Sequence, residues 1–164
     1  GALSFDMALG AVGTDAFAGC DGLETVDFLA GVSAFGDRVF ANCLSLGEVR
    51  FIGAAPTAGE EVFLGTEEVV VRYLSTSASW SNTFGGAEAE AWTPEVVSAA
   101  VETNAFQLNV EWASGQTLKV QSSARLDEPI WEDVGTYVTV NGSCVVRDTN
   151  WVNGSQRTYR MVSP

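Results

Sequence analysis

The sequence repeats itself with a period of 23 residues, and this repeat is the feature that most constrains its fold. Residues 12–28 recur as residues 35–51, and a third, weaker copy occupies residues 58–66. The copies share a glycine followed four residues later by a phenylalanine, at Gly13 and Phe17, Gly36 and Phe40, and Gly59 and Phe63. A unit this short cannot bury its own apolar side chains, so successive copies must stack on one another. The repeat therefore predicts a solenoid in which the phenylalanines form a continuous core.

Each complete copy ends in an alternating apolar run, the pattern of a half-buried β-strand. In the first copy Val26 and Phe28 are expected to face the core, while Thr25 and Asp27 face outward. The segment before this strand is too short for an independent helix but long enough for one or two helical turns. We therefore expect each 23-residue coil to consist of a short parallel strand and a short helical return.

The repeat follows the pattern Gly-x-x-x-Phe-x-(Gly/Asn)-Cys-x-x-Leu-x-x-Val-x-Phe, over residues 13–28 and 36–51. It resembles the BspA-type leucine-rich repeats of bacterial and protist surface proteins. After the third copy, Trp80 and Phe84 precede a Gly-Gly pair and a short segment that ends at Trp92. This ending is similar to the terminal cap of such arrays. The resemblance implies a leucine-rich-repeat solenoid over residues 1–92 and a binding role outside the cell or at its surface.

The remaining chain has a different pattern. Residues 93–104 fit no repeat and are predicted to be a linker, and residues 105–164 are predicted to form a small all-β, antiparallel, sandwich-like domain. Its expected strands are 106–112 and 117–122, which we predict to pair as a hairpin, followed by 131–134, 137–140, 144–147 and 158–162. Turns are expected at Asn141-Gly142 and Asn153-Gly154. The elements Arg125 to Trp131 and Tyr159-Arg160 also resemble a short β-domain that ends many secreted bacterial proteins, which suggests a secretion or surface context.

The formal charge of −13 repels phosphate backbones, so nucleic acid is not an expected partner. No apolar run approaches the roughly 18 residues that span a bilayer, so membrane insertion is not expected. We expect the sequence to be part of a longer secreted chain, because its first residues read as the end of a truncated repeat.

The sequence contains no histidine, which excludes Ser-His-Asp and Cys-His catalysis and histidine-based zinc sites. Cys20 and Cys43 fall in the same register as Thr66, and we interpret them as a ladder of small buried residues without predicting a disulfide; Cys144 has no evident partner. The adjacent carboxylates are candidate acid–base pairs by type but are expected at coil edges and turns, namely Glu60-Glu61, Glu67-Glu68 and Glu132-Asp133. We therefore predict a protein that is not an enzyme and has no assigned cofactor or metal site, while calcium binding by the same carboxylates stays open because no Asp-x-Asp-x-Asp loop specifies it.

Two sets of residues are candidates for binding. Asp27, Arg50 and Arg72 are expected in one row on the exposed sheet face, with Ser4 before them, and could recognise a protein or host-surface ligand. The alternative is that Asp27 and Arg50 only neutralise each other. Three tryptophans could instead stack on sugar rings, or fill the core of the second domain, and they are Trp112, Trp131 and Trp151. The first set predicts a protein-binding adhesion module, and the second a glycan-binding accessory module of a larger secreted protein or enzyme.

Overall fold

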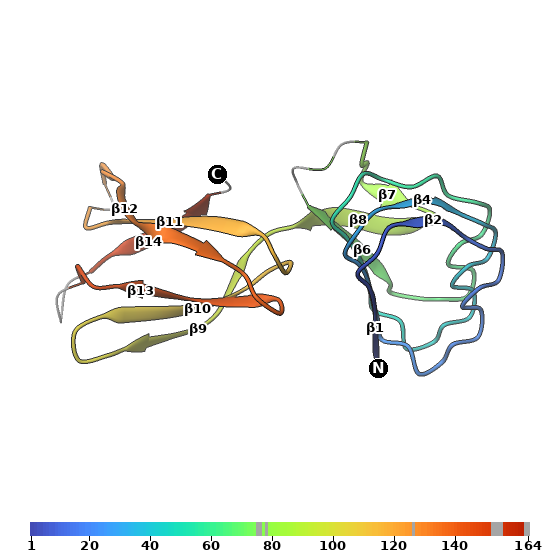
Figure 1. The fold of residues 1–164 in the computed structure, drawn as a ribbon, viewed down its shortest axis with the longest axis horizontal. Helices are drawn as coiled ribbons and strands as arrows, with labels where there is room; N and C mark the ends of the chain where they lie inside the picture. Colours follow the sequence, from blue (N-terminus) through green and yellow to red (C-terminus); the bar gives the residue numbers. More distant parts are fainter. Residues whose placement is uncertain (75–76, 78, 126, 152–155, 163–164) are drawn as a thin grey trace. The chain divides into compact units, whose positions relative to one another are not determined.

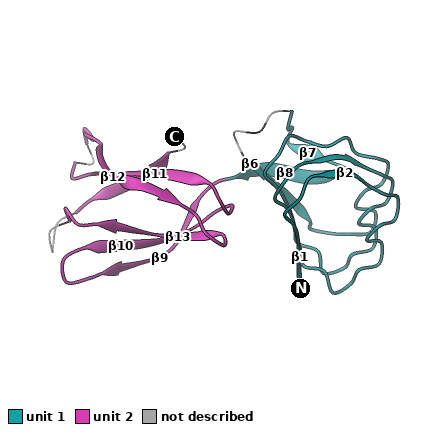
Figure 2. Ribbon diagram, in the orientation of Figure 1, with its two compact units in different colours: residues 1–92 teal, residues 93–164 magenta. Residues whose placement is uncertain are grey.

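A computed structural model of the chain describes residues 1–74, 77, 79–125, 127–151 and 156–162. The described residues form strands and turns, with no helix, so none of them forms a helix that could cross a membrane. The chain divides into two compact units, residues 1–92 and residues 93–164 (Figure 2).

The first unit is a parallel β-solenoid (Figure 1). Its main sheet contains, in spatial order, β1 (Ala2–Phe5), β3 (Thr25–Phe28), β5 (Glu48–Phe51), β6 (Val70–Leu74), β8 (Ala87–Trp92) and β7 (Thr83–Phe84). The first five are parallel neighbours, and β7 pairs antiparallel with β8. Val26 lies opposite Val49, one sequence period away. The 23-residue spacing thus sets the register of β1, β3 and β5, as the repeat predicts.

A second, narrower parallel sheet was not expected from the sequence. It pairs β2 (Leu9–Val12) with β4 (Val32–Phe35), and a single bridge from Ala34 to Thr57 extends it to the third coil. Each coil therefore carries more strand than the repeat pattern indicates.

The predicted helical return is wrong, because the returns are series of tight turns. Positive φ angles recur at two positions of each return, at Asp15 and Gly19, Arg38 and Asn42, and Glu61 and Gly65. A right-handed helix needs φ near −63°, so these positions break it. The turns are also bonded between coils: the N–H of Phe17 donates to Val39 O at 2.9 Å, and that of Phe40 donates to Val62 O at 2.9 Å.

The left-handed positions give a test of this return. Gly19 has φ +71° with open space where a Cβ would lie, whereas a Cβ on Gly65, at φ +68°, would lie 2.4 Å from Asn42 Oδ1. Gly19→Ala is expected to destabilise the first unit by about 1 to 2 kcal/mol through backbone strain alone. Gly65→Ala should destabilise it more, because Asn42 must also move. Urea denaturation followed by circular dichroism measures both, and equal stability of wild type and variants would contradict the turn geometry.

Aromatic ladders form the core of the first unit. Phe40 stacks between Phe17 and Phe63, with ring centroids 5.3 and 5.7 Å away. Phe28 stacks in the same way between Phe5 and Phe51, at 5.2 and 5.0 Å. These contacts confirm the predicted stacking of phenylalanines in successive coils. Burial on the strands also follows the predicted alternation, since Val26 and Phe28 are buried while Thr25 and Asp27 are only partly covered.

The cap of the solenoid is built mainly by Trp80 and Phe84. The Trp80 ring stacks on Tyr73 at 4.8 Å, and Phe84 packs edge-on against Phe51 at 5.7 Å. Trp92, which we also expected to cover the last coil, ends β8, and the guanidinium of Arg50 lies over its ring at 5.1 Å.

The second unit is sandwich-like, with two antiparallel sheets of three strands each (Figure 1). One sheet has the order β13 (Ser143–Asp148), β10 (Phe106–Glu111), β9 (Glu95–Val101), and the other has the order β12 (Glu132–Val138), β11 (Thr117–Ser123), β14 (Thr158–Val162). Its larger buried apolar side chains are Leu108, Val110, Trp112, Leu118, Val120 and Val146.

Three predictions for this unit need correction. Residues 93–104 are not a free linker, because they contain β9, which pairs with β10. β10 and β11 do not form a hairpin with each other; their connection crosses from one sheet to the other. The strands predicted on either side of Gly135 form one continuous strand, β12, with a register shift opposite Val120 and Gln121.

The predicted turn at Asn141-Gly142 is confirmed. Both residues have positive φ, 51° and 81°, as a type I′ turn requires. The turn predicted at Asn153-Gly154 lies outside the described residues.

Candidate functional site

The outward face of the main sheet carries a continuous polar row. Pairing between neighbouring strands brings five side chains into line, in the order Ser4, Asp27, Arg50, Arg72 and Glu90. The alternation of each strand turns these residues outward while their valine neighbours fill the core. The three residues predicted from the sequence, Asp27, Arg50 and Arg72, are therefore brought together on adjacent strands.

Ion pairs link the members of this polar row. Arg50 Nη1 lies 3.5 Å from Asp27 Oδ1, and Arg72 Nη2 lies 3.1 Å from Glu90 Oε1. Glu48, which lies on β5 two residues before Arg50, pairs with both Arg50 and Arg72. The alternative in which Asp27 and Arg50 neutralise each other thus describes part of a larger network. Glu48 and Glu90 were not predicted from the sequence, although their outward register could have revealed them.

The network leaves hydrogen-bonding capacity unused. Asp27 Oδ1, Arg50 Nε and Arg72 Nε are buried from solvent and have no hydrogen-bond partner among the residues that the structure describes. Although Arg72 Nε is 2.6 Å from Glu48 Oε1, that contact is an ion pair without hydrogen-bond geometry. Partly exposed ion pairs of this kind contribute about 0 to 1 kcal/mol each. Stability alone therefore does not explain why two arginines lie side by side.

The three candidate sugar-stacking tryptophans have different surroundings. Trp112 is buried, with 6% of its surface exposed. Trp131 is half-buried, and the guanidinium of Arg160 lies over its ring at 4.3 Å. Trp151 packs against Phe106, with centroids 5.9 Å apart, beside a pocket of about 800 Å³. The burial of Trp112 leaves it no open ring face for a sugar.

The three cysteines are free thiols, and two of them, Cys43 and Cys144, lie in settings that lower their reactivity. The buried Cys43 thiol donates to Phe17 O at 3.0 Å, and the Cys43 N–H donates to Thr66 Oγ1 at 3.0 Å. Burial raises the pKa of Cys43 and of Cys144 above the usual thiol value, which lowers the thiolate fraction at neutral pH. The ladder of Cys20, Cys43 and Thr66 thus packs the returns together.

The paired carboxylates lie on turns and on an exposed strand. Hydrogen bonds from Gln121 and Lys119 lower the pKa of Asp133, which makes it a poor proton donor. Within the described ranges, no three acidic, cysteine or histidine side chains come together in a way that could hold a metal ion.

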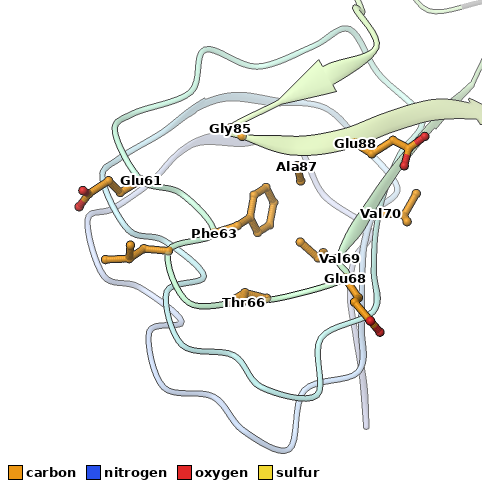
Figure 3. A pocket seen from close by; sticks show the side chains of 11 residues that line it. Glu61, Phe63, Thr66, Glu68, Val69, Val70, Gly85, Ala87 and Glu88 are labelled. Atoms are coloured by element: carbon orange, nitrogen blue, oxygen red, sulfur yellow. The ribbon is translucent and has the colours of Figure 1, made fainter.

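A pocket of about 630 Å³ lies at the end of the solenoid, above the third return (Figure 3). Phe63, Thr66 and Val69 line its inner part, and the turn between β7 and β8 passes over one side. That turn lies close to the third return, because a Cβ on Gly85, which has φ +58°, would lie 2.9 Å from Val62 Cβ. The cap therefore approaches the third return at Val62 and Phe63 and leaves a pocket beside this contact, which we call the open end of the solenoid.

This open end exposes backbone donors that other coils use. The N–H groups of Arg38, Phe40 and Asn42 donate to carbonyls of the third return, at 2.7 to 3.0 Å. The equivalent N–H groups one coil later belong to Glu61, Phe63 and Gly65, and within the described part of the chain they have no acceptor.

Glutamates surround the pocket. Glu61, Glu68 and Glu88 are exposed at its rim, and none of them forms an ion pair with a described residue (Figure 3). From the sequence, Glu60-Glu61 and Glu67-Glu68 were considered as catalytic pairs or calcium ligands. The end of the array after the third copy was predicted, but the cap was expected to cover the whole last coil, so the position of these glutamates at a pocket was missed.

No protein-family model, curated protein or solved structure matches the chain.

Proposed function

We propose that this protein is a non-catalytic extracellular binding or adhesion module that recognises a protein or host-surface ligand through the polar row of its main sheet. The observation that carries the proposal is the continuous line from Ser4 to Glu90, with Trp92 beside Arg50. Arginine and tryptophan are enriched among the residues that dominate protein interfaces.

The arrangement of charge supports recognition over stabilisation. Residues 1–92 contain thirteen acidic side chains and only three arginines, and two of these arginines are neighbours in the polar row. Like charges placed opposite each other on adjacent strands are unfavourable unless a counter-charge holds them, as Glu48 does here. The unused groups of Arg50 and Arg72 remain available for a ligand once the side chains shift.

The cellular location rests on the sequence. The resemblance of the repeat to BspA-type surface proteins supports an extracellular or surface position. The absence of histidine, the raised thiol pKa values and the lowered pKa of Asp133 support a binding role over catalysis.

The test is a screen of the whole chain against an array of individually displayed secreted and cell-surface proteins. For a protein bound by the wild type, the double variant Arg50→Ala and Arg72→Ala is expected to bind at least about tenfold more weakly, since interface arginines often contribute more than 1 kcal/mol each. Arg38→Ala is the matched control, because Arg38 pairs with Asp15 on a return, away from the main sheet. Unchanged binding by the double variant would refute the assignment of the polar row.

A glycan array in parallel addresses the alternative ligand class. Glycan binding that is lost on replacing Trp131 and Trp151 with alanine, with no protein bound in the first screen, would replace the proposal with the glycan-binding accessory module.

A further inference from the structure

We infer that the open end of the solenoid is a second binding site, which takes a short cationic peptide segment laid along the third return as a missing fourth return would lie. This site goes beyond the proposed function, because it uses a different surface of the first unit from the polar row.

Backbone geometry defines what the site can accept. The first return bonds to the second, and the second to the third, in one pattern. Alternate N–H groups of one return donate to alternate carbonyls of the next, such as Phe40 N–H to Val62 O and Asn42 N–H to Leu64 O. Glu61, Phe63 and Gly65 offer the same pattern of donors with no acceptor among the described residues. A peptide backbone supplies three carbonyls at this spacing, as residues 60–64 do for the second coil. Main-chain pairing of this type is a recurring mode of peptide recognition.

The charge of the rim selects the peptide. Glu61, Glu68 and Glu88 are exposed around the pocket, and none of them has an ion-pair partner in the described part of the chain. Lysine or arginine side chains on a bound segment would complete these pairs, and the long-range field of a chain with formal charge −13 would attract them. The same carboxylates repel phosphate and other anions that free N–H groups would otherwise attract.

The inner part of the pocket accepts an apolar side chain. Phe63, Val69 and Ala87 are buried core residues that line it, with Thr66 at its base (Figure 3). A cationic segment with a valine or alanine between its basic residues therefore fits both parts of the site. A second copy of this chain fits less well, because its first return carries Asp15 and Asp21, which would face the rim glutamates.

The experiment titrates the whole chain, labelled with nitrogen-15, with a blocked heptapeptide in which lysine alternates with alanine and valine. The amide signals of Glu61, Phe63 and Gly65 are expected to shift saturably, while those of Arg38, Phe40 and Asn42, which are already bonded, shift little. An ester in place of the central peptide amide provides a weaker carbonyl acceptor and should weaken binding. A heptapeptide with glutamate in place of lysine should not bind.

Variants separate a specific site from general charge attraction. The triple variant Glu61→Gln, Glu68→Gln and Glu88→Gln is expected to weaken binding about tenfold or more. The matched control, Asp6→Asn with Glu95→Gln and Glu111→Gln, removes three exposed carboxylates elsewhere and should change affinity less than threefold. All six side chains are exposed, so both variants should retain the wild-type circular dichroism spectrum.

Equal weakening by the two triple variants, or shifts spread over the acidic surface, would overturn the inference. Shifts at the open end that appear with rising protein concentration, without peptide, would assign the site to a second copy and also overturn it. Neither outcome tests the polar row. That row is tested by Arg50→Ala and Arg72→Ala, which leave the open end unchanged.

Discussion

Replacing Phe40 with alanine is expected to destabilise the first unit by about 3 to 5 kcal/mol, the cost of emptying a large buried site. Phe40 is fully buried at the centre of its ladder. Its ring contacts Phe17 at 5.3 Å, Phe63 at 5.7 Å and Phe35 at 5.8 Å. Rings above, below and beside the cavity are held by their own coils, so they cannot collapse into it.

Amide hydrogen exchange of the full chain measures this effect unit by unit. Protection at Val49 in the first unit should fall in the Phe40→Ala variant. Phe17→Ala is the control, because Phe17 is only partly buried at the end of the same ladder and should cost less. Equal losses from the two variants would contradict the stacked core.

Replacing Arg157 with alanine is expected to destabilise the second unit by about 3 to 5 kcal/mol, because it leaves a buried carboxylate without its counter-charge. Asp148 is 2% exposed, and Arg157 Nη1 lies 3.6 Å from its Oδ2. The Tyr159 hydroxyl donates to the same oxygen at 3.0 Å, and the N–H of Asn150 donates to the other at 2.9 Å. These two neutral donors cannot replace the lost positive charge.

Two variants separate charge from packing in this network. Burial, and then the bond to Asp148, raises the pKa of Tyr159, so the hydroxyl stays protonated at neutral pH. Tyr159→Phe removes only that bond and is expected to cost about 1 to 3 kcal/mol. Combining Asp148→Asn with Arg157→Met removes both charges and should recover part of the stability lost in Arg157→Ala. Exchange at Val110 measures each variant, and a double variant less stable than Arg157→Ala would contradict the electrostatic explanation.

The repeat predicted the sheet of the first unit well because a fixed period leaves little choice of register. Once Val26, Val49 and their phenylalanine neighbours must stack, the strands that carry them can only be parallel and in register. The return was harder to predict. Gly19, Asn42 and Gly65 did indicate a left-handed position, but Arg38 and Glu61 take the same conformation without any preference for it.

In the second unit, the alternation of apolar and polar residues predicted strands but not which strands pair. The pattern of residues 106–112 and 117–122 located two strands but not their partners, since alternation gives the buried face and not the neighbour. Because Trp112 and Ala113 are buried where the chain crosses between the sheets, the connection is part of the core and not an exposed hairpin turn. β9 was missed because its residues do not alternate between apolar and polar, although most are apolar, and in the structure all seven are exposed.

The polar row and the open end also differ in how far the sequence predicts them. Asp27, Arg50 and Arg72 could be placed in one row from the period. The outward register of Glu48 and Glu90 could have been predicted too, but which arginine each carboxylate pairs with depends on side-chain reach across strands. The open end depends on backbone donors that every residue carries. Which of these N–H donors lack an acceptor is known only once the structure shows which return is the last in the stack.

The most direct test of the solenoid account is amide hydrogen exchange of the free chain at six equivalent positions. Arg38, Phe40 and Asn42 are expected to exchange slowly, because their N–H groups are bonded to the third return. Glu61, Phe63 and Gly65, one coil later, are expected to exchange quickly. Equal protection at the two sets would contradict both the stacking of returns and the open end, and with them the peptide site inferred there.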